Sequence, residues 1–150
     1  MISIQMIHLE HPLYPQEQEL RNKILLRPIG MPDHAWEMHD AKSWHFVATA
    51  DKTVVGCVVL NPLNENKTKA QLMQMAVETN QQGKGIGKLL VDNLIAFAKA
   101  NNIQEIVCHA RENAAPFYTR LGFQIYDDPF IEVGMKHYHM KIVLANSKKR

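Results

Sequence analysis

The chain has 150 residues, a formal net charge of +2 and 46% hydrophobic residues. This length and composition predict one globular domain over residues 1–150, with a core of its own. The small charge argues against a nucleic-acid partner, so the basic end at residues 148–150 is read as a solvated, disordered tail.

The sequence predicts a cytoplasmic protein with no membrane partner. Its first twelve residues lack the basic region and the long apolar run of a signal peptide, and no stretch has the length of a membrane span. Cys57 and Cys108 lie inside apolar, strand-like runs. We therefore expect both to be reduced thiols in the core.

Apolar spacing and turn residues give the elements of the first half. In chain order they are a strand at 2–9, a helix at 15–27, a loop at 27–34, strands at 44–50 and 53–60, and a turn at 61–67. Asp51 and Lys52 separate the last two strands, so these strands are predicted to form a hairpin.

The second half alternates strands and helices. The predicted elements are a strand at 70–78, a helix at 85–100, a strand at 104–110, a helix at 113–121, and strands near 122–127 and 137–144. The buried face of the longer helix is expected to carry Ile86, Leu89, Leu90, Leu94, Phe97 and Ala98. An early hairpin followed by this alternation predicts an α/β fold with a mixed sheet.

A dense glycine loop joins the strand at 70–78 to the helix at 85–100. Its sequence, "QQGKGIGKLL" (81–90), has neither the spacing of a P-loop nor that of a Rossmann fingerprint. A tight loop that opens a helix presents unpaired backbone N–H groups, and the helix dipole favours an anion there. The loop is either a pyrophosphate-binding segment or a plain turn between two core elements, and the first interpretation is favoured.

Two motifs follow one another in the second half of the chain. The first is Gln82-x-x-Gly85-x-Gly87, and the second runs from Asn113 through Phe117-Tyr118 to Leu121-Gly122-Phe123. Together these motifs closely resemble the GNAT superfamily of N-acetyltransferases. The resemblance covers residues 70–144 well and the first 70 residues in element order only. It implies a GNAT-type acyl-CoA N-acyltransferase fold, with a central twisted mixed sheet flanked by helices, and acetyl-CoA as cosubstrate.

The resemblance also implies which residues hold the CoA part of the cosubstrate. The pyrophosphate would lie on the loop, and the pantetheine arm would pair with the end of the preceding strand, where the N–H of Val77 would polarise the thioester carbonyl. Asn113 would be a further contact, and it is also expected to cap the following helix. The implied cofactor residues are Met75, Ala76, Val77, Gln82, Gly83, Lys84, Gly85, Ile86, Gly87, Lys88 and Asn113.

The catalytic residues implied by the resemblance are Tyr118, Glu132 and His137. Tyr118 falls on the family's general acid, and a phenol with an ordinary pKa near 10 stays protonated at neutral pH. The alternative is that Tyr118 is a core aromatic, as Phe117 is expected to be. Glu132 and His137 are candidates for the general base, and a structural role stays open for both.

The acceptor side is less defined by the sequence. Arg27, Gln74 and His109 are candidate substrate residues, although a core position is the favoured interpretation of His109. His139 is expected to face solvent. No metal site is predicted, because neither Cys nor a carboxylate stands at ligand spacing from His137 and His139.

Two function classes follow from these residues. The favoured one is an N-acetyltransferase that moves the acetyl group directly to a primary amine of a small molecule or peptide. The alternative is a regulatory module that binds CoA without turnover. A homodimer is left open, and the acceptor itself is not encoded in any motif.

Overall fold

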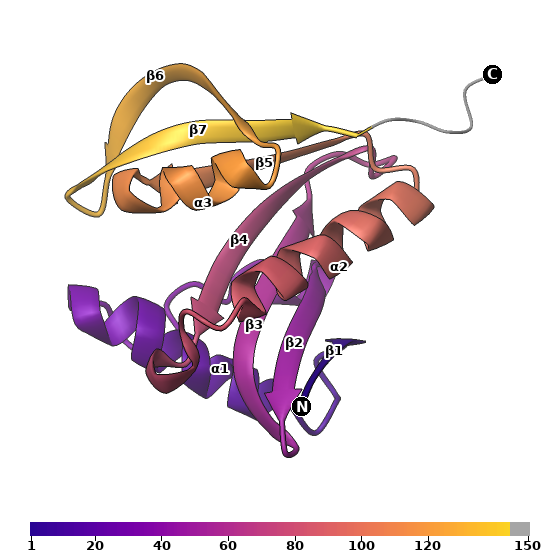
Figure 1. The fold of residues 1–150 in the computed structure, drawn as a ribbon, viewed down its shortest axis with the longest axis vertical. Helices are drawn as coiled ribbons and strands as arrows, with labels where there is room; N and C mark the ends of the chain where they lie inside the picture. The colour runs from indigo at the N-terminus through magenta and orange to yellow at the C-terminus, as the bar shows by residue number, and fades with distance from the viewer. Residues whose placement is uncertain (145–150) are drawn as a thin grey trace. The chain divides into compact units, whose positions relative to one another are not determined.

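The computed structural model describes residues 1–144, and the predicted tail at 148–150 lies outside the described residues. The strands are β1 (Ile2–Ile7), β2 (Trp44–Ala50), β3 (Thr53–Pro62), β4 (Lys69–Val77), β5 (Glu105–Arg111), β6 (Gln124–Glu132) and β7 (Met135–Val143). The α-helices are α1 (Tyr14–Arg21), α2 (Ile86–Ala100) and α3 (Ala115–Arg120) (Figure 1). The strands follow the order β1-β2-β3-β4-β5-β7-β6 in one mixed sheet, which confirms the predicted fold class.

The chain divides into two compact units. The first contains residues 1–61 and 73–97, and the second contains residues 62–72 and the described residues from 98 to 144. Strand β4 and helix α2 each contribute residues to both units. The single domain expected over residues 1–150 stays a prediction.

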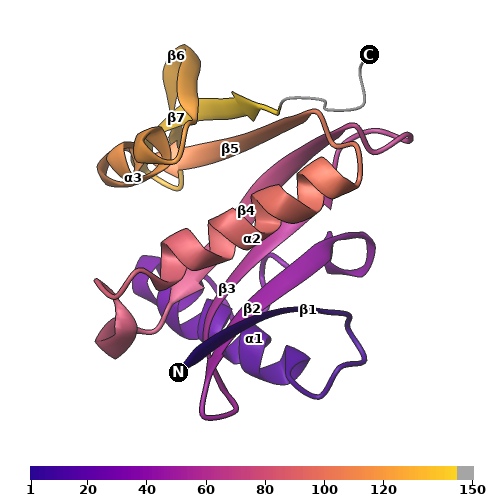
Figure 2. The same cartoon turned by 45° about the vertical axis from the view of Figure 1, so that its right-hand side comes forward.

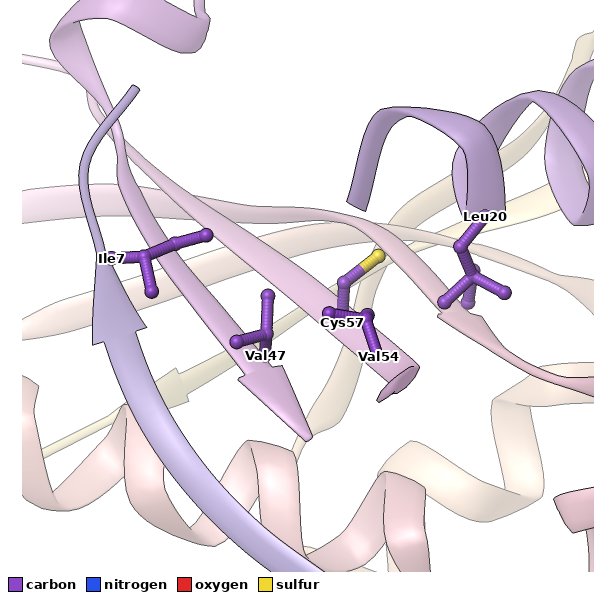
Figure 3. Packing of buried hydrophobic residues seen from close by; sticks show 6 residues of the cluster. Ile7, Leu20, Val47, Val54 and Cys57 are labelled. Carbon is purple, nitrogen blue, oxygen red and sulfur yellow. The ribbon is translucent and has the colours of Figure 1, made fainter. Parts of the chain in front are cut away.

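In the first unit, β2 and β3 carry different side chains on their two faces. Val47 pairs with Cys57 on the face covered by α1, and both belong to a cluster with Ile7, Leu20, Val54 and Ala76 (Figure 3). The neighbouring pair, Ala48 and Gly56, lies on the opposite face, which α2 covers (Figure 2). Alternation along each strand therefore packs one helix on each side.

Gly56 sets how closely α2 approaches the sheet. A Cβ at this position would lie 3.0 Å from Cγ2 of Ile86 and 3.1 Å from Cδ1 of Leu90. The first turn of α2 can therefore lie this close to β3 only because residue 56 has no side chain. Leu89, expected on the buried face, is 42% exposed, because the buried stripe follows Ile86, Leu90 and Leu94 at four-residue spacing.

In the second unit, α3 contacts β5 and β7. The ring of Tyr118 packs against Phe123, and Cys108 pairs in register with Met140. Both cysteines of the chain are free and buried, as predicted. Burial raises the pKa of the Cys108 thiol to about 12, so this thiol stays protonated at neutral pH.

Several boundaries differ from those expected. The helix predicted over 15–27 ends at Arg21 and continues as a π-turn (Asn22–Leu26) and a 3₁₀ turn (Arg27–Ile29). Pro28 has no N–H to donate to the carbonyl four residues earlier, so regular helix bonds cannot continue through this position. The hairpin at Asp51-Lys52 is confirmed, and both residues have positive φ.

The last two strands are longer than predicted and form one hairpin. Its turn is Val133-Gly134, with φ values of +45° and +76°. A β-branched residue at positive φ is rare, so this turn has no strong signature in the sequence. Pro129 is tolerated in β6 because β6 is the edge strand.

A buried ion network holds α1 against the segment that leads into β2. The guanidinium of Arg21 donates to Glu17 and to Asp40, each at 2.9 Å, and all three residues are at most 3% exposed. His45 is 1% exposed, with Nδ1 2.8 Å from Glu17 Oε2 and Nε2 2.9 Å from the Asp40 carbonyl oxygen. A doubly protonated His45 donates to both acceptors, and the network then carries two positive and two negative charges.

This network predicts that stability falls as the pH rises. Burial by itself would lower the pKa of His45, but the hydrogen bond and the charge of Glu17 outweigh it, and the pKa is raised. The unfolded value is about 6.5, so the contribution of His45 is fully present below that pH and is lost as the pH rises through the folded pKa. Urea unfolding between pH 6 and pH 9 should show this loss.

The matched variants are His45→Gln and His8→Gln, since His8 is exposed. His45→Gln should remove the part of the pH dependence that His45 causes, and His8→Gln should leave the slope unchanged. An unchanged slope in His45→Gln would contradict the charged form of this histidine.

Candidate functional site

The glycine loop lies between β4 and α2 in the first unit. Gly83 and Gly85 have φ values of +81° and +82°, and a Cβ built on either one would meet no atom within 4 Å. The left-handed conformation explains the glycines, and the open space leaves their main chain accessible. The first bond of the helix runs from Leu89 N–H to the Gly85 carbonyl, so the N–H groups of the residues between them point out of the helix end.

Two polar side chains of the loop are bonded to other residues of the chain, and a third is exposed. Gln82 donates from Nε2 to the carbonyl oxygen of Val77 at 3.0 Å, which ties the loop to the end of β4. The ammonium of Lys88 lies 2.7 Å from Asp92 on the exposed side of α2, and Lys84 is exposed. The available donors of this loop are therefore mainly backbone N–H groups.

Strand β4 changes conformation at Gln74. Its φ is +57°, and the register with β5 covers Lys69 to Leu72 only. The side-chain amide of Gln74 donates to the backbone carbonyl oxygen of Trp36 at 3.1 Å. The backbone carbonyl oxygen of Gln74 accepts from the Cys57 thiol at 3.5 Å. A residue predicted to face the substrate is thus bonded to the segment before β2.

The residues that follow Gln74 carry little side-chain chemistry. Ala76 is buried, and Met75 and Val77 are half-buried. Hydrogen-bonding groups in this part of β4 are therefore those of the main chain.

Arg27 has two carboxylate partners. Its guanidinium bonds Glu19 at 2.9 and 3.2 Å and Asp33 at 2.7 and 3.0 Å. Hydrogen bonds to Asp33 and then to Glu19 raise the pKa of Arg27. An acidic group of a substrate would have to displace one of these carboxylates.

Tyr118 lies in α3 in the second unit and is 7% exposed. Its ring makes edge contacts with Phe117 at 5.0 Å and Phe123 at 5.5 Å between centroids. Burial, with a smaller effect from Cys108, raises the pKa of the phenol. The hydroxyl therefore keeps its proton at neutral pH and can act as a donor.

Asn113 is not the helix cap that the sequence suggested. It is exposed and lies inside a 3₁₀ turn (Glu112–Ala114), and Ala114 is the residue that caps α3. The 3₁₀ turn leads directly into α3, so the cap position falls on Ala114, which makes no side-chain cap hydrogen bond.

Histidine and aromatic rings gather on β5, β6 and β7. Phe130 stacks on His139 at 4.2 Å, and the His109 ring lies 5.0 Å from Phe130 and 5.3 Å from His139. His109 Nδ1 is 3.2 Å from Glu132. The core position favoured for His109 is wrong, because β5 alternates and Cys108 and Ala110 point inward in its place.

His139 pairs in register with the exposed His109, so both lie on the same outward face of β5 and β7. On that face the ring of His139 is half-buried under Phe130.

His137 is 5% exposed, and its ring is oriented by one hydrogen bond. Nδ1 lies 2.9 Å from the carbonyl oxygen of Met135. A carbonyl only accepts, so Nδ1 carries a proton and the lone pair of the neutral ring is on Nε2. Nε2 is the atom of His137 that can take a proton.

The candidates thus fall into two groups. The first unit holds the glycine loop, residues 75–77, Gln74 and Arg27, and the second holds Tyr118, Asn113, His109, Glu132 and His137. Sequence reasoning did not identify Trp36 or the network of Glu17, Arg21, Asp40 and His45. Glu17 and Arg21 stand at i and i+4, a spacing usually found in solvated helix pairs, so the sequence held no signal for their burial.

Within residues 1–144, no group of three or more His, Cys, Asp or Glu side chains is placed to hold a metal ion. In the same part of the chain, no helix has both the length and the apolar character of a membrane-spanning segment.

Comparison with known proteins identifies the family. A family model described as an acetyltransferase (GNAT) domain matches residues 30–144. N-acetyltransferase 8 of Mus musculus is 26% identical over 97 residues, which are 61% of this chain and 43% of that protein. The chain spans less than half the length of the curated relatives it matches.

Solved structures share the fold. A putative N-acetyltransferase from Lactobacillus plantarum has a TM-score of 0.84 at 16% identity, covering 96% of this chain and 99% of that one. A GNAT family acetyltransferase from Elizabethkingia anophelis, solved with acetyl-CoA bound, has a TM-score of 0.74 at 19% identity, covering 95% and 98%. With the family model spanning most of its length, the chain belongs to the GNAT acetyltransferase family.

Proposed function

We propose that this protein is an acetyl-CoA-dependent N-acetyltransferase that moves an acetyl group directly to a primary amine of a small molecule or peptide. The observation that carries the proposal is the glycine loop. Gly83 and Gly85 adopt left-handed conformations with open space above them, at the start of a 15-residue helix. Such a helix end binds phosphate through its main chain.

Binding is assigned to the first unit. The N–H groups of residues 82–88 would hold the pyrophosphate, with Lys84 and Lys88 adding positive charge nearby. The main chain of residues 75–77 would pair with the pantetheine arm, and the N–H of Val77 would donate to the thioester oxygen, where negative charge develops during the reaction. The acetyl-CoA bound to the Elizabethkingia anophelis relative supports this ligand.

Proton transfers are assigned to the second unit. His137 Nε2 would take a proton from the acceptor amine, and Glu132 is the alternative base acting through water. The amine nitrogen attacks the thioester carbon, the C–N bond forms and the C–S bond breaks. The departing thiolate takes the phenolic proton of Tyr118, which leaves CoA as a free thiol.

The charge of the acceptor and the cellular location of the protein are proposed from composition and from the state of the thiols. We propose a neutral or weakly charged amine, since the net charge of +2 favours neither a polyanion nor a polycation. The two free, buried thiols agree with a cytoplasmic location.

Acetyl-CoA is expected to stabilise the protein against heat. A ligand that binds only the folded state stabilises it by about 2.7 kcal/mol at a hundredfold excess over its dissociation constant. Acetyl-CoA at millimolar concentration should therefore raise the melting temperature by several degrees, measured by scanning fluorimetry. NAD and ATP serve as controls because they share phosphate groups and adenine, and they should have much smaller effects.

A melting temperature that acetyl-CoA leaves unchanged, but that NAD or ATP raises, would contradict the assignment of the ligand.

A further inference from the structure

One carbonyl oxygen joins two parts of the first unit. The backbone oxygen of Trp36 accepts a hydrogen bond from Arg21 Nη2 at 2.9 Å and another from Gln74 Nε2 at 3.1 Å. A carbonyl has two lone pairs, so both bonds form at once. Because a carbonyl cannot donate, this contact also fixes which end of the Gln74 amide faces it.

The Trp36 side of this contact is held firmly. Arg21 is 2% exposed and donates to both carboxylate oxygens of Asp40 and to Glu17. Asp40 in turn accepts from Tyr14, and Glu17 lies beside His45. A guanidinium held by several charge-assisted bonds is a rigid donor, so it fixes the position of the Trp36 carbonyl.

The Gln74 side needs such support. A residue other than glycine at φ +57° within a strand occupies a sparsely populated conformation, which persists only where the surroundings hold it. Besides its place in the β3–β4 part of the sheet, Gln74 makes two further contacts, one from its side-chain amide to Trp36 and one from the Cys57 thiol to its backbone carbonyl oxygen. A thiol is a weak donor, so the amide contact is the stronger of these two restraints.

We infer that Gln74 is a positioning residue, whose amide fixes the direction in which the main-chain groups of residues 75–77 point. The role of those groups in holding the acyl-CoA rests on the proposed function. The buried network of Glu17, Arg21 and Asp40 holds the other end of the contact. The amide thus acts through the backbone of β4 and need not touch either substrate.

A loss of this restraint should affect turnover more than binding. Most of the affinity for acetyl-CoA would come from the glycine loop, whereas kcat depends on how accurately the Val77 N–H meets the thioester oxygen. Gln74→Met and Gln74→Glu keep an unbranched side chain of similar length and remove the N–H donor. Each should lower kcat about tenfold, the equivalent of one well-placed hydrogen bond, and change the dissociation constant of acetyl-CoA less than threefold.

The direct test uses the free protein and needs no activity. Backbone amide exchange at residues 75–77, followed by NMR, should become about tenfold faster in Gln74→Met than in the wild type. Gln71→Glu is the matched control, because it lies on the same strand outside the contact and should leave the exchange unchanged. Melting temperatures of the variants show that each one is folded.

The outcomes separate the inference from the proposed function. Unchanged exchange at residues 75–77 in Gln74→Met overturns the positioning role, whatever the activity is. Equal acceleration in Gln71→Glu overturns it as well, because the effect would then be a general loosening of β4. If exchange accelerates in Gln74→Met alone while the wild type neither binds acetyl-CoA nor releases thiol, the positioning role stands and the proposed function fails.

Discussion

Replacing Tyr118 with phenylalanine should lower kcat by roughly 10²–10⁴-fold, the usual contribution of general acid catalysis, while the affinity for acetyl-CoA changes only a few-fold. The substitution keeps the ring that packs on Phe117 and Phe123 and removes only the hydroxyl. Burial raises the pKa of this phenol, so the wild-type residue carries its proton throughout the neutral range. Steady-state kinetics combined with calorimetric titration of acetyl-CoA measure both quantities.

Tyr138→Phe is the matched control, since Tyr138 is a half-buried tyrosine of the same unit with no catalytic assignment. It should keep wild-type kcat. A base variant such as His137→Gln should differ from Tyr118→Phe by recovering part of its rate at high pH, where the amine deprotonates without help. If Tyr118→Phe retains full kcat while the chemical step is rate-limiting, the tyrosine only packs, and another group protonates the thiolate.

The second large effect is expected in the glycine loop, where Gly85→Val should weaken acetyl-CoA binding by about 100-fold. Gly85 has φ +82°, a conformation that costs a β-branched residue on the order of 1–3 kcal/mol. The new side chain also occupies the open space through which a pyrophosphate would reach the main chain. Lys84→Ala removes one exposed charge and should weaken binding less than fivefold.

Gly30→Val controls for backbone strain. Gly30 has φ +75° and equally open space above it, so the substitution brings a similar local cost at a distance from the loop along the chain. It should lower the melting temperature and leave acetyl-CoA affinity unchanged. Equal losses in Gly85→Val and Lys84→Ala would instead indicate that side-chain charge holds the phosphates.

Local signals made much of the fold predictable. The first hairpin was predictable because two polar residues, Asp51 and Lys52, separate two apolar runs. Both residues have positive φ in the turn. The glycine loop was predictable for a similar reason, since three glycines in five residues have few uses other than an open backbone. The end of the regular helix at Arg21 was missed because the apolar spacing of Leu20 and Ile24 is the same for a regular helix and for the start of a π-turn.

Features that depend on tertiary contacts were not predictable from local patterns. The positive φ of Gln74 depends on a carbonyl 38 residues away in sequence, and nothing in "AQLMQMAV" (70–77) signals it. The buried network combines Glu17 and Arg21 with Asp40 and His45, none of which belongs to a motif. The stacking of His139 on Phe130 is a diagonal contact in an irregular hairpin, whose register pairs Phe130 with His137 and shifts between Tyr126 and Phe130. The turn of this hairpin lacks the usual Asn-Gly or Asp-Gly signal.

The most direct test of the central claim is a thiol-release assay with acetyl-CoA and a panel of amines. The panel should cover amino acids, polyamines, aminoglycosides, amino sugars and peptide N-termini. An N-acetyltransferase predicts release of free CoA thiol that depends on the amine, saturates with its concentration and is lost in Tyr118→Phe. Saturable binding of acetyl-CoA with no thiol release for any amine would contradict the claim and identify a CoA-binding module without turnover.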